Sequence, residues 1–183
     1  MAVRTPTWRS VSLAAALSLV LSLSACGDDP DTLSHVAVDR TVVDAETSQT
    51  TTVHGYVPDI ATPVGFDAGG GIEDPVIVAV DVTVSVGPDR TFSVRRGDFE
   101  LRTSSGEVSA ALTTVDRTLQ DESLWPLTET RTGGTQRGWV AFAVDREAVD
   151  GATLVANRPD AMTVDGAGSL AAAALDVPLT PAG

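Results

Sequence analysis

The sequence predicts an all-β fold, an antiparallel sandwich or barrel, because strand patterns follow one another along the chain and helical periodicity is missing. Val76 to Val86 alternates valine with mostly small or polar residues, and such alternation places the valines on one face of a strand. Turn residues such as Gly87-Pro88-Asp89 and Ser104-Ser105-Gly106 recur at short intervals. Short strands between close turns, without alternating helices, indicate antiparallel pairing.

The region before this valine-rich strand predicts two strands and a long loop. Residues 36–43 and 50–57 are rich in valine and threonine, which favour strands. From Pro58 to Pro75 the chain contains three prolines and a glycine triplet, a composition typical of irregular structure. We expect Phe66 and Ile60 to be exposed in this region.

Further strands are expected over residues 91–94, 98–101 and 108–115, followed by a polar stretch from 120 to 135. The second strong strand pattern is 136–144, with Val140, Phe142 and Val144 on one face and Trp139 on the other. Residues 152–156 and 171–178 are expected to close the sheets, although the alanines of the last segment also favour helix.

The first 25 residues predict a signal peptide. Arg4 and Arg9 precede an uncharged run from Val11 to Leu23. This run is shorter than the roughly 20 apolar residues that a membrane-spanning helix needs. Basic residues, a short apolar run and then small residues are the order found in secretory leaders.

The leader ends in Leu23-Ser24-Ala25-Cys26, which resembles the bacterial lipobox. The resemblance implies that the Cys26 thiol receives a diacylglyceryl group and that the leader is cut just before it; in such proteins the new amine is commonly acylated, for example with palmitate. Cys26 is the only cysteine of the chain. We therefore expect a signal peptide over 1–25, a lipidated cysteine and flexible acidic tether over 26–34, and a domain over 35–183.

The charge of the chain argues against nucleic acid as a partner. The formal net charge is −13, and removal of Arg4 and Arg9 with the leader leaves 10 arginines against 25 acidic residues, a net charge of −15. Binding to phosphate backbones or to anionic lipid headgroups requires a basic patch. Membrane attachment is thus expected through the lipid anchor. The chain has no lysine, and this bias is typical of a high-GC bacterial genome such as an actinobacterial one.

Three pieces of the strand pattern resemble a known family. They are V-A-V-D-V-T-V over 78–84, D-F-E-L over 98–101 and G-W-V-A-F-A-V over 138–144. In this order they resemble the immunoglobulin-like domain of exported bacterial proteins of the DUF4352 family and of MPT63-type secreted antigens. The resemblance covers roughly residues 35–178 and implies an immunoglobulin-like β-sandwich and an exported location. It implies no activity, because a fold does not determine a function.

No combination of residues predicts a catalytic site, a metal site or a cofactor, so we expect a protein that is not an enzyme. His35 and His54 are the only histidines, and a metal site needs three or four ligands. The serines lack the G-x-S-x-G pattern of a nucleophile elbow. Arg96-Gly97-Asp98 spells an adhesion tripeptide, but its glycine and aspartate are also what a turn requires, and we favour the turn.

Aromatic residues give the candidate binding surface. Trp125 lies beside a proline in a predicted loop, Trp139 on the non-core face of its strand, and Phe66 in the long loop. Exposed aromatics commonly anchor a partner, although Trp139 can equally pack under a loop. The favoured function is a surface lipoprotein whose domain binds a protein or an envelope component. The alternative is a carrier or sensor of a small apolar ligand between the sheets.

Overall fold

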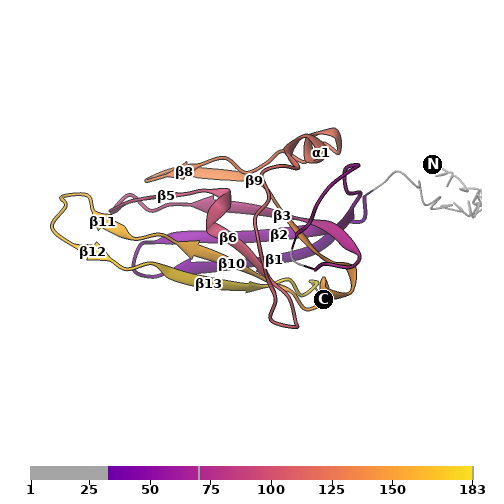
Figure 1. Cartoon of the computed structure of the whole chain (residues 1–183). Helices are drawn as coiled ribbons and strands as arrows, with labels where there is room; N and C mark the ends of the chain where they lie inside the picture. The colour runs from indigo at the N-terminus through magenta and orange to yellow at the C-terminus, as the bar shows by residue number, and fades with distance from the viewer. Residues whose placement is uncertain (1–32, 70, 183) are drawn as a thin grey trace, which may run out of the picture. The chain divides into compact units, whose positions relative to one another are not determined.

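Two four-stranded antiparallel sheets form the main body of the domain (Figure 1). The computed structural model describes residues 33–69 and 71–182. The first sheet has the order β1-β2-β3-β9, with β1 at Val36–Asp44, β2 at Gln49–Ile60, β3 at Pro75–Ser85 and β9 at Thr135–Asp145. The second sheet has the order β13-β10-β6-β7, with β13 at Ala173–Pro178, β10 at Thr153–Arg158, β6 at Phe99–Arg102 and β7 at Val108–Ala110.

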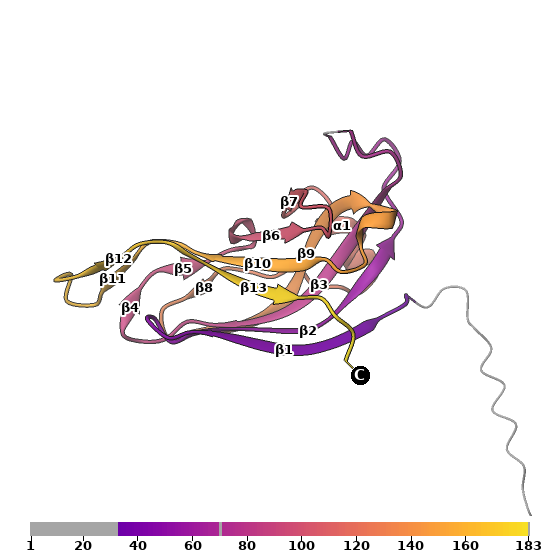
Figure 2. The ribbon, with the colours of Figure 1, turned by 90° about the horizontal axis from the view of Figure 1, so that it is seen from below.

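The two sheets pack face to face, and their shared interior is the inner core. As predicted, the alternating valines of β3 and its extension all point into this core, and each is at most 1% exposed: Val76, Val78, Val80, Val82, Val84 and Val86. Phe99, Leu101 and Leu154 meet them from the second sheet. Figure 2 shows the two layers separately. The predicted antiparallel β-sandwich is confirmed.

The strand order also confirms the immunoglobulin-like topology. Constant-type immunoglobulin domains pair strand B with E in one sheet, and C with F and F with G in the other. When β2 is taken as strand A, the observed pairs β3–β9, β6–β10 and β10–β13 correspond to these three pairings. Two features are additional: β1 extends the first sheet beyond β2, and the short β7 pairs with β6 in the second sheet.

Two small sheets extend the sandwich at the end opposite to the start of β1 (Figure 1). One has the order β12-β11-β4, with β12 at Ser169–Leu170, β11 at Ala161–Thr163 and β4 at Arg90–Thr91. The other pairs β5, Ser93–Val94, with β8, Thr130–Arg131. The sequence pattern did not indicate the β11–β12 hairpin, because two- and three-residue strands are too short to show alternation.

The long loop after β2 is irregular, as predicted, but Ile60 is not exposed. Ile60 is the last residue of β2 and is 1% exposed. Phe66, inside the loop, is half-buried.

The strand predicted over 108–115 is only partly correct. Its first three residues form β7, and the chain then turns into the short helix α1 at Asp116–Asp121. Val115 and Leu119 lie four residues apart, both are 1% exposed, and the Leu119 amide donates to the Val115 carbonyl at 3.0 Å. Side chains at this spacing share one face of a helix. A single helical turn is too short to show a period in the sequence.

Helix α1 covers the outer face of the first sheet. A second hydrophobic group, here called the outer cluster, lies between them and consists of Val57, Ile60, Ile77, Ala79, Val115, Leu119, Leu124 and Ala141. Leu33, Phe66, Leu112 and Trp139 pack around it, half-buried. Strand β3 is therefore buried on both faces over part of its length.

An ion pair is buried inside the sandwich, at the end of β10. Arg158 is 1% exposed, and its Nε lies 2.5 Å from Oδ2 of Asp44, the last residue of β1. Its Nη2 donates to the Ala171 carbonyl at 2.7 Å. Asp44 accepts from the Glu46 amide at 2.9 Å and from the Thr47 hydroxyl at 2.8 Å. Because both ions are hydrogen-bonded, their burial is tolerated, and the pair joins the two sheets.

Candidate functional site

Residues Trp125 to Leu127 run alongside β9 and are held there by backbone hydrogen bonds. The Trp139 amide donates to the Trp125 carbonyl, and the Leu127 amide donates to the Trp139 carbonyl, both at 2.9 Å. Gly138 makes this approach possible, because a Cβ on it would lie 2.5 Å from Cα and 2.6 Å from N of Leu127. Such distances are well inside van der Waals contact, so any side chain at 138 would displace the segment.

The same segment places Trp125 at the surface. Leu124 is 9% exposed and packs into the outer cluster, while Leu127 is 2% exposed and packs into the inner core. Trp125, between these two anchors, is 67% exposed. Burial of a leucine side chain is favourable by roughly 1.5–3 kcal/mol, so the two leucines hold the backbone of Trp125 in place and leave its indole at the surface.

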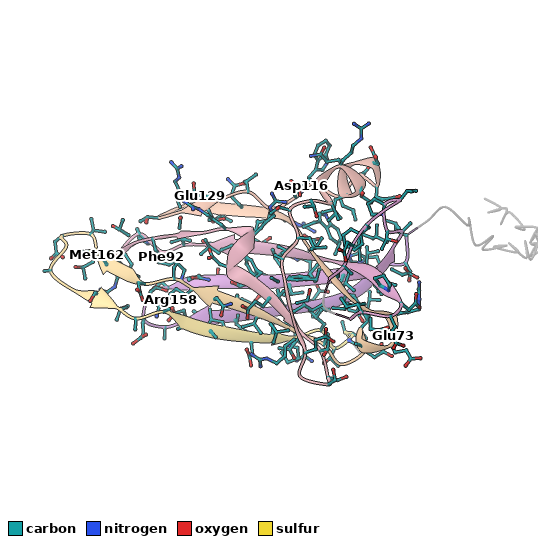
Figure 3. The ribbon with its side chains drawn as sticks, in the orientation of Figure 1. Glu73, Phe92, Asp116, Glu129, Arg158 and Met162 are labelled. Carbon is teal, nitrogen blue, oxygen red and sulfur yellow. The ribbon has the colours of Figure 1, made fainter. Side chains whose placement is uncertain are left out.

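An open groove of about 420 Å³ lies beside Trp125 and is called the Trp125 groove here. Pro126 and Leu127 form part of its wall. The remaining lining side chains are polar and come from four parts of the chain: Arg96, Asp116, Gln120, Thr128, Gln136 and Arg137. Asp116 lies at the start of α1 (Figure 3). The groove therefore combines one exposed aromatic ring with several hydrogen-bonding groups.

Salt bridges hold the two arginines of the groove. Arg137 donates from Nε to Oδ1 of Asp81 at 3.1 Å and from Nη2 to Oδ2 at 2.6 Å. Asp81 is 4% exposed, and its hydrogen bonds and charge raise the pKa of the Arg137 guanidinium. The Arg137 side chain is nevertheless 62% exposed. Arg96 donates to Asp116 from the neighbouring short 3₁₀ helix η1, Arg96–Asp98.

Of the three aromatic residues predicted to form a binding surface, only Trp125 is exposed. Trp139 is half-buried, supports the outer cluster, and meets the His35 ring edge to face with the ring centres 6.0 Å apart. Phe66 packs on the same cluster and lines a separate hollow of about 340 Å³ with Pro63 and Thr114. The structure thus joins Trp125 to Trp139 through their backbones and places Phe66 elsewhere.

The predicted lipidation site lies outside the described residues. This holds for Leu23, Ser24, Ala25 and Cys26, and for the tether as far as residue 32. Among the described helices, none has the length and apolar character needed to span a membrane.

The other candidate motifs have structural roles. Arg96-Gly97-Asp98 forms η1, in which the Asp98 carboxylate accepts from the Arg95 amide at 2.7 Å, so the predicted turn is confirmed. His54 on β2 lies 2.8 Å from the Thr83 hydroxyl. Within 33–69 and 71–182, no three His, Cys, Asp or Glu side chains gather in a way that would hold a metal ion.

Sequence reasoning found Trp125 but not the residues around it. The sequence pattern marks Arg96 only as part of a tripeptide, and Gln136 and Arg137 only as the start of a strand. These groups meet because the turn at η1, helix α1 and β9 converge in space. One signal was present in the sequence: a glycine directly before Trp139 in a strong strand, which marks a close backbone approach.

Neither a protein-family model nor a curated protein matches the sequence. Solved structures do resemble the fold. A functionally unknown protein of Listeria monocytogenes EGD-e matches with a TM-score of 0.51 at 12% identity, over 80% of this chain and 85% of that one. The Bacillus subtilis protein ycdA, a candidate lipoprotein, matches with a TM-score of 0.47 at 14% identity, over 78% of this chain and 38% of its own. Likeness at such low identity concerns the fold alone.

Proposed function

We propose that the chain is an exported lipoprotein, anchored at the extracytoplasmic face of the cell membrane through Cys26, whose β-sandwich is a non-enzymatic binding domain. The Trp125 groove is the observation that supports this proposal most strongly. A large aromatic side chain is held exposed by two buried leucines beside a polar groove. Exposed aromatic and arginine side chains are the usual anchors of binding surfaces.

The sequence supports the anchoring part of the proposal. The leader and Leu23-Ser24-Ala25-Cys26 have the order of a lipoprotein signal. One acyl chain gives only marginal, reversible membrane binding, so stable attachment takes two or more. With its net charge of −15 after cleavage, the mature chain would be repelled by anionic headgroups, and attachment rests on the lipid.

The tether limits how far the domain reaches. Six residues lie between Cys26 and Leu33, and the seven Cα-to-Cα steps of a fully extended chain span at most about 25 Å. Leu33 and Trp139 both pack on the outer cluster, so the domain begins on the side of the first sheet that α1 covers.

The packing of the inner core favours surface binding over the alternative of a carried apolar ligand. Phe99, Phe142 and Leu154 are each 0% exposed and fill the space between the sheets. Protein interiors packed in this way have few voids larger than a water molecule.

Metabolic labelling and fractionation test the anchor. Cells expressing the full chain are grown with labelled palmitate, and the protein is expected to carry the label and to sediment with membranes. Cys26→Ala is expected to abolish both. Equal labelling of the two forms, or no labelling of either, would refute the lipid anchor.

In-cell crosslinking tests the binding function. A photoreactive amino acid replaces Gln136 at the groove or, as the control, Arg117, which is exposed on α1 and does not line the groove. We expect adducts from position 136 only. The binding function would be contradicted by the same adducts at both positions, or by none at either.

A further inference from the structure

The Trp125 groove has the size and construction of a site for a small ligand or for a short stretch of a polymer. Its volume of about 420 Å³ falls within the roughly 300–1,000 Å³ typical of ligand sites. Trp125 offers a large apolar ring at its edge, and Pro126 and Leu127 continue the apolar wall.

The charges of the groove are balanced in pairs, whereas those of the chain are not. Arg96 is bonded to Asp116, and Arg137 to Asp81. The whole chain, in contrast, carries a net charge of −13. A polyanion would be repelled by the domain as a whole, and a polycation would gain little from arginines that already have acidic partners. The balance favours an uncharged ligand.

The lining groups match a ligand rich in hydroxyl groups. Gln120 and Gln136 each supply an amide that both donates and accepts, and Thr128 supplies a hydroxyl that does the same. Arg137 uses Nε and Nη2 for Asp81, and its Nη1 takes part in neither bond. Sugar hydroxyls donate and accept as well, and the C–H face of a pyranose ring is flat and apolar enough to stack on an indole.

We infer that the Trp125 groove binds a neutral polysaccharide of the cell envelope, with Trp125 as the stacking platform and the surrounding amides, hydroxyl and guanidinium as hydrogen-bonding partners. This inference rests on the proposed function and specifies its ligand.

Direct binding to sugars tests the inference. The full chain, extracted in detergent, is applied to an array of neutral hexose and N-acetylhexosamine oligosaccharides. We expect saturable binding to a subset of them, weakened at least tenfold by Trp125→Ala and about threefold or more by Gln136→Ala. Arg117→Ala, the control outside the groove, is expected to bind as the unmodified chain does. Because Trp125 is exposed, its loss should leave the thermal midpoint unchanged.

The outcomes separate this inference from the proposed function. Absence of sugar binding, or equal binding by Trp125→Ala, overturns the polysaccharide inference. If position 136 then crosslinks to a protein in cells, the groove is a protein-binding site and the proposed function stands. If neither sugar nor crosslinked partner is found, the proposed binding function fails as well.

Discussion

The inner face of the first sheet is covered by another sheet, whereas its outer face is covered by loops and one helical turn. The inner face packs against the strands of the second sheet, and every second residue of β3 is a valine that is at most 1% exposed. The outer face combines apolar residues such as Ile77 with Asp81 and its partner Arg137. Irregular segments can bring polar groups from distant parts of the chain together, and the Trp125 groove lies at their edge.

The difference shows where this fold has room for function. A sheet-on-sheet interface must be filled closely by side chains from both layers, and a buried charge there requires a partner of opposite charge, as Arg158 has in Asp44. A face covered by loops leaves some groups exposed.

The largest effect is expected from Arg158→Met, which leaves the buried Asp44 without its positive partner. Breaking a buried ion pair on one side costs about 3–5 kcal/mol, measured as the loss of unfolding free energy in urea. The double variant Arg158→Met/Asp44→Leu should recover most of the loss, because no charge remains buried. If the unfolding free energy of Arg158→Met lies within about 1 kcal/mol of that of the unmodified protein, the ion pair is not buried from solvent.

Leu119→Ala tests whether the outer cluster is as much a core as the inner one. Leu119 is 1% exposed, and truncating a buried leucine to alanine typically costs about 2–5 kcal/mol. Leu154→Ala, at a residue 0% exposed in the inner core, is the matched comparison. Both losses are measured as the decrease in unfolding free energy in urea. If the decrease for Leu119→Ala is less than about a quarter of that for Leu154→Ala, the outer cluster contributes little to the stability of the fold.

Acid is expected to weaken the inner core through Asp44. Burial alone would raise the pKa of Asp44, but hydrogen bonds from the Glu46 amide and the Thr47 hydroxyl, together with the charge of Arg158, lower it overall. A carboxylate with a depressed pKa in the folded state stabilises the fold above its unfolded pKa. That stability is lost as the pH falls below about 3.8 and through the folded value.

Urea unfolding between pH 5 and 2 measures this loss, with the Arg158→Met/Asp44→Leu variant as the control for all other carboxylates. The unmodified protein should lose more stability than the double variant over this interval. Parallel curves would show that Asp44 has no depressed pKa.

The smallest effect on stability is expected at Glu129, on the outer surface beside β8 (Figure 3). Hydrogen bonds from Arg95 and then from Arg131 and Ser93 lower the pKa of Glu129 to about 2. The Arg95 Nη2 lies 2.8 Å from Oε1, and the Arg131 Nη2 lies 2.8 Å from Oε2. Exposed ion pairs contribute little to folding, so the loss of stability on protonation of Glu129 should be smaller than the loss at Asp44.

The titration itself is the readout for Glu129. The ¹³C signal of its carboxyl group should titrate near pH 2, and Arg95→Gln should move the midpoint upward toward 4.5, the ordinary value. A midpoint already near 4.5 in the unmodified protein would show that Arg95 and Arg131 do not form these ion pairs with Glu129 in solution.

The sequence predicted the sandwich because its strongest strands follow simple alternation. In β3 and β9 the inner residues, such as Val80 and Phe142, repeat every second position, and this period is a direct consequence of strand geometry. Strands β10 and β13 were also found. Their pairing across the second sheet depends on contacts between distant segments, which no local pattern shows.

The groove was harder to predict for a physical reason. Trp125 was identified because an aromatic beside proline in a polar stretch is often exposed. Trp139 and Phe66 are half-buried because α1 and loop residues cover them. In the sequence, only Val115 and Leu119, one helical turn apart, point to this helix. The meeting of Arg137 with Asp81 requires the register of β3 and β9, which is a tertiary property.

Gly138 has a consequence for recognising related proteins. Its missing side chain admits the backbone of Pro126 and Leu127, so glycine at 138 and the Leu-Trp-Pro-Leu run of 124–127 depend on each other. Sandwiches that carry this groove should keep both features together. Those that share only the strand order should vary freely at either place, and a search for the paired motif would separate the two groups without any structure.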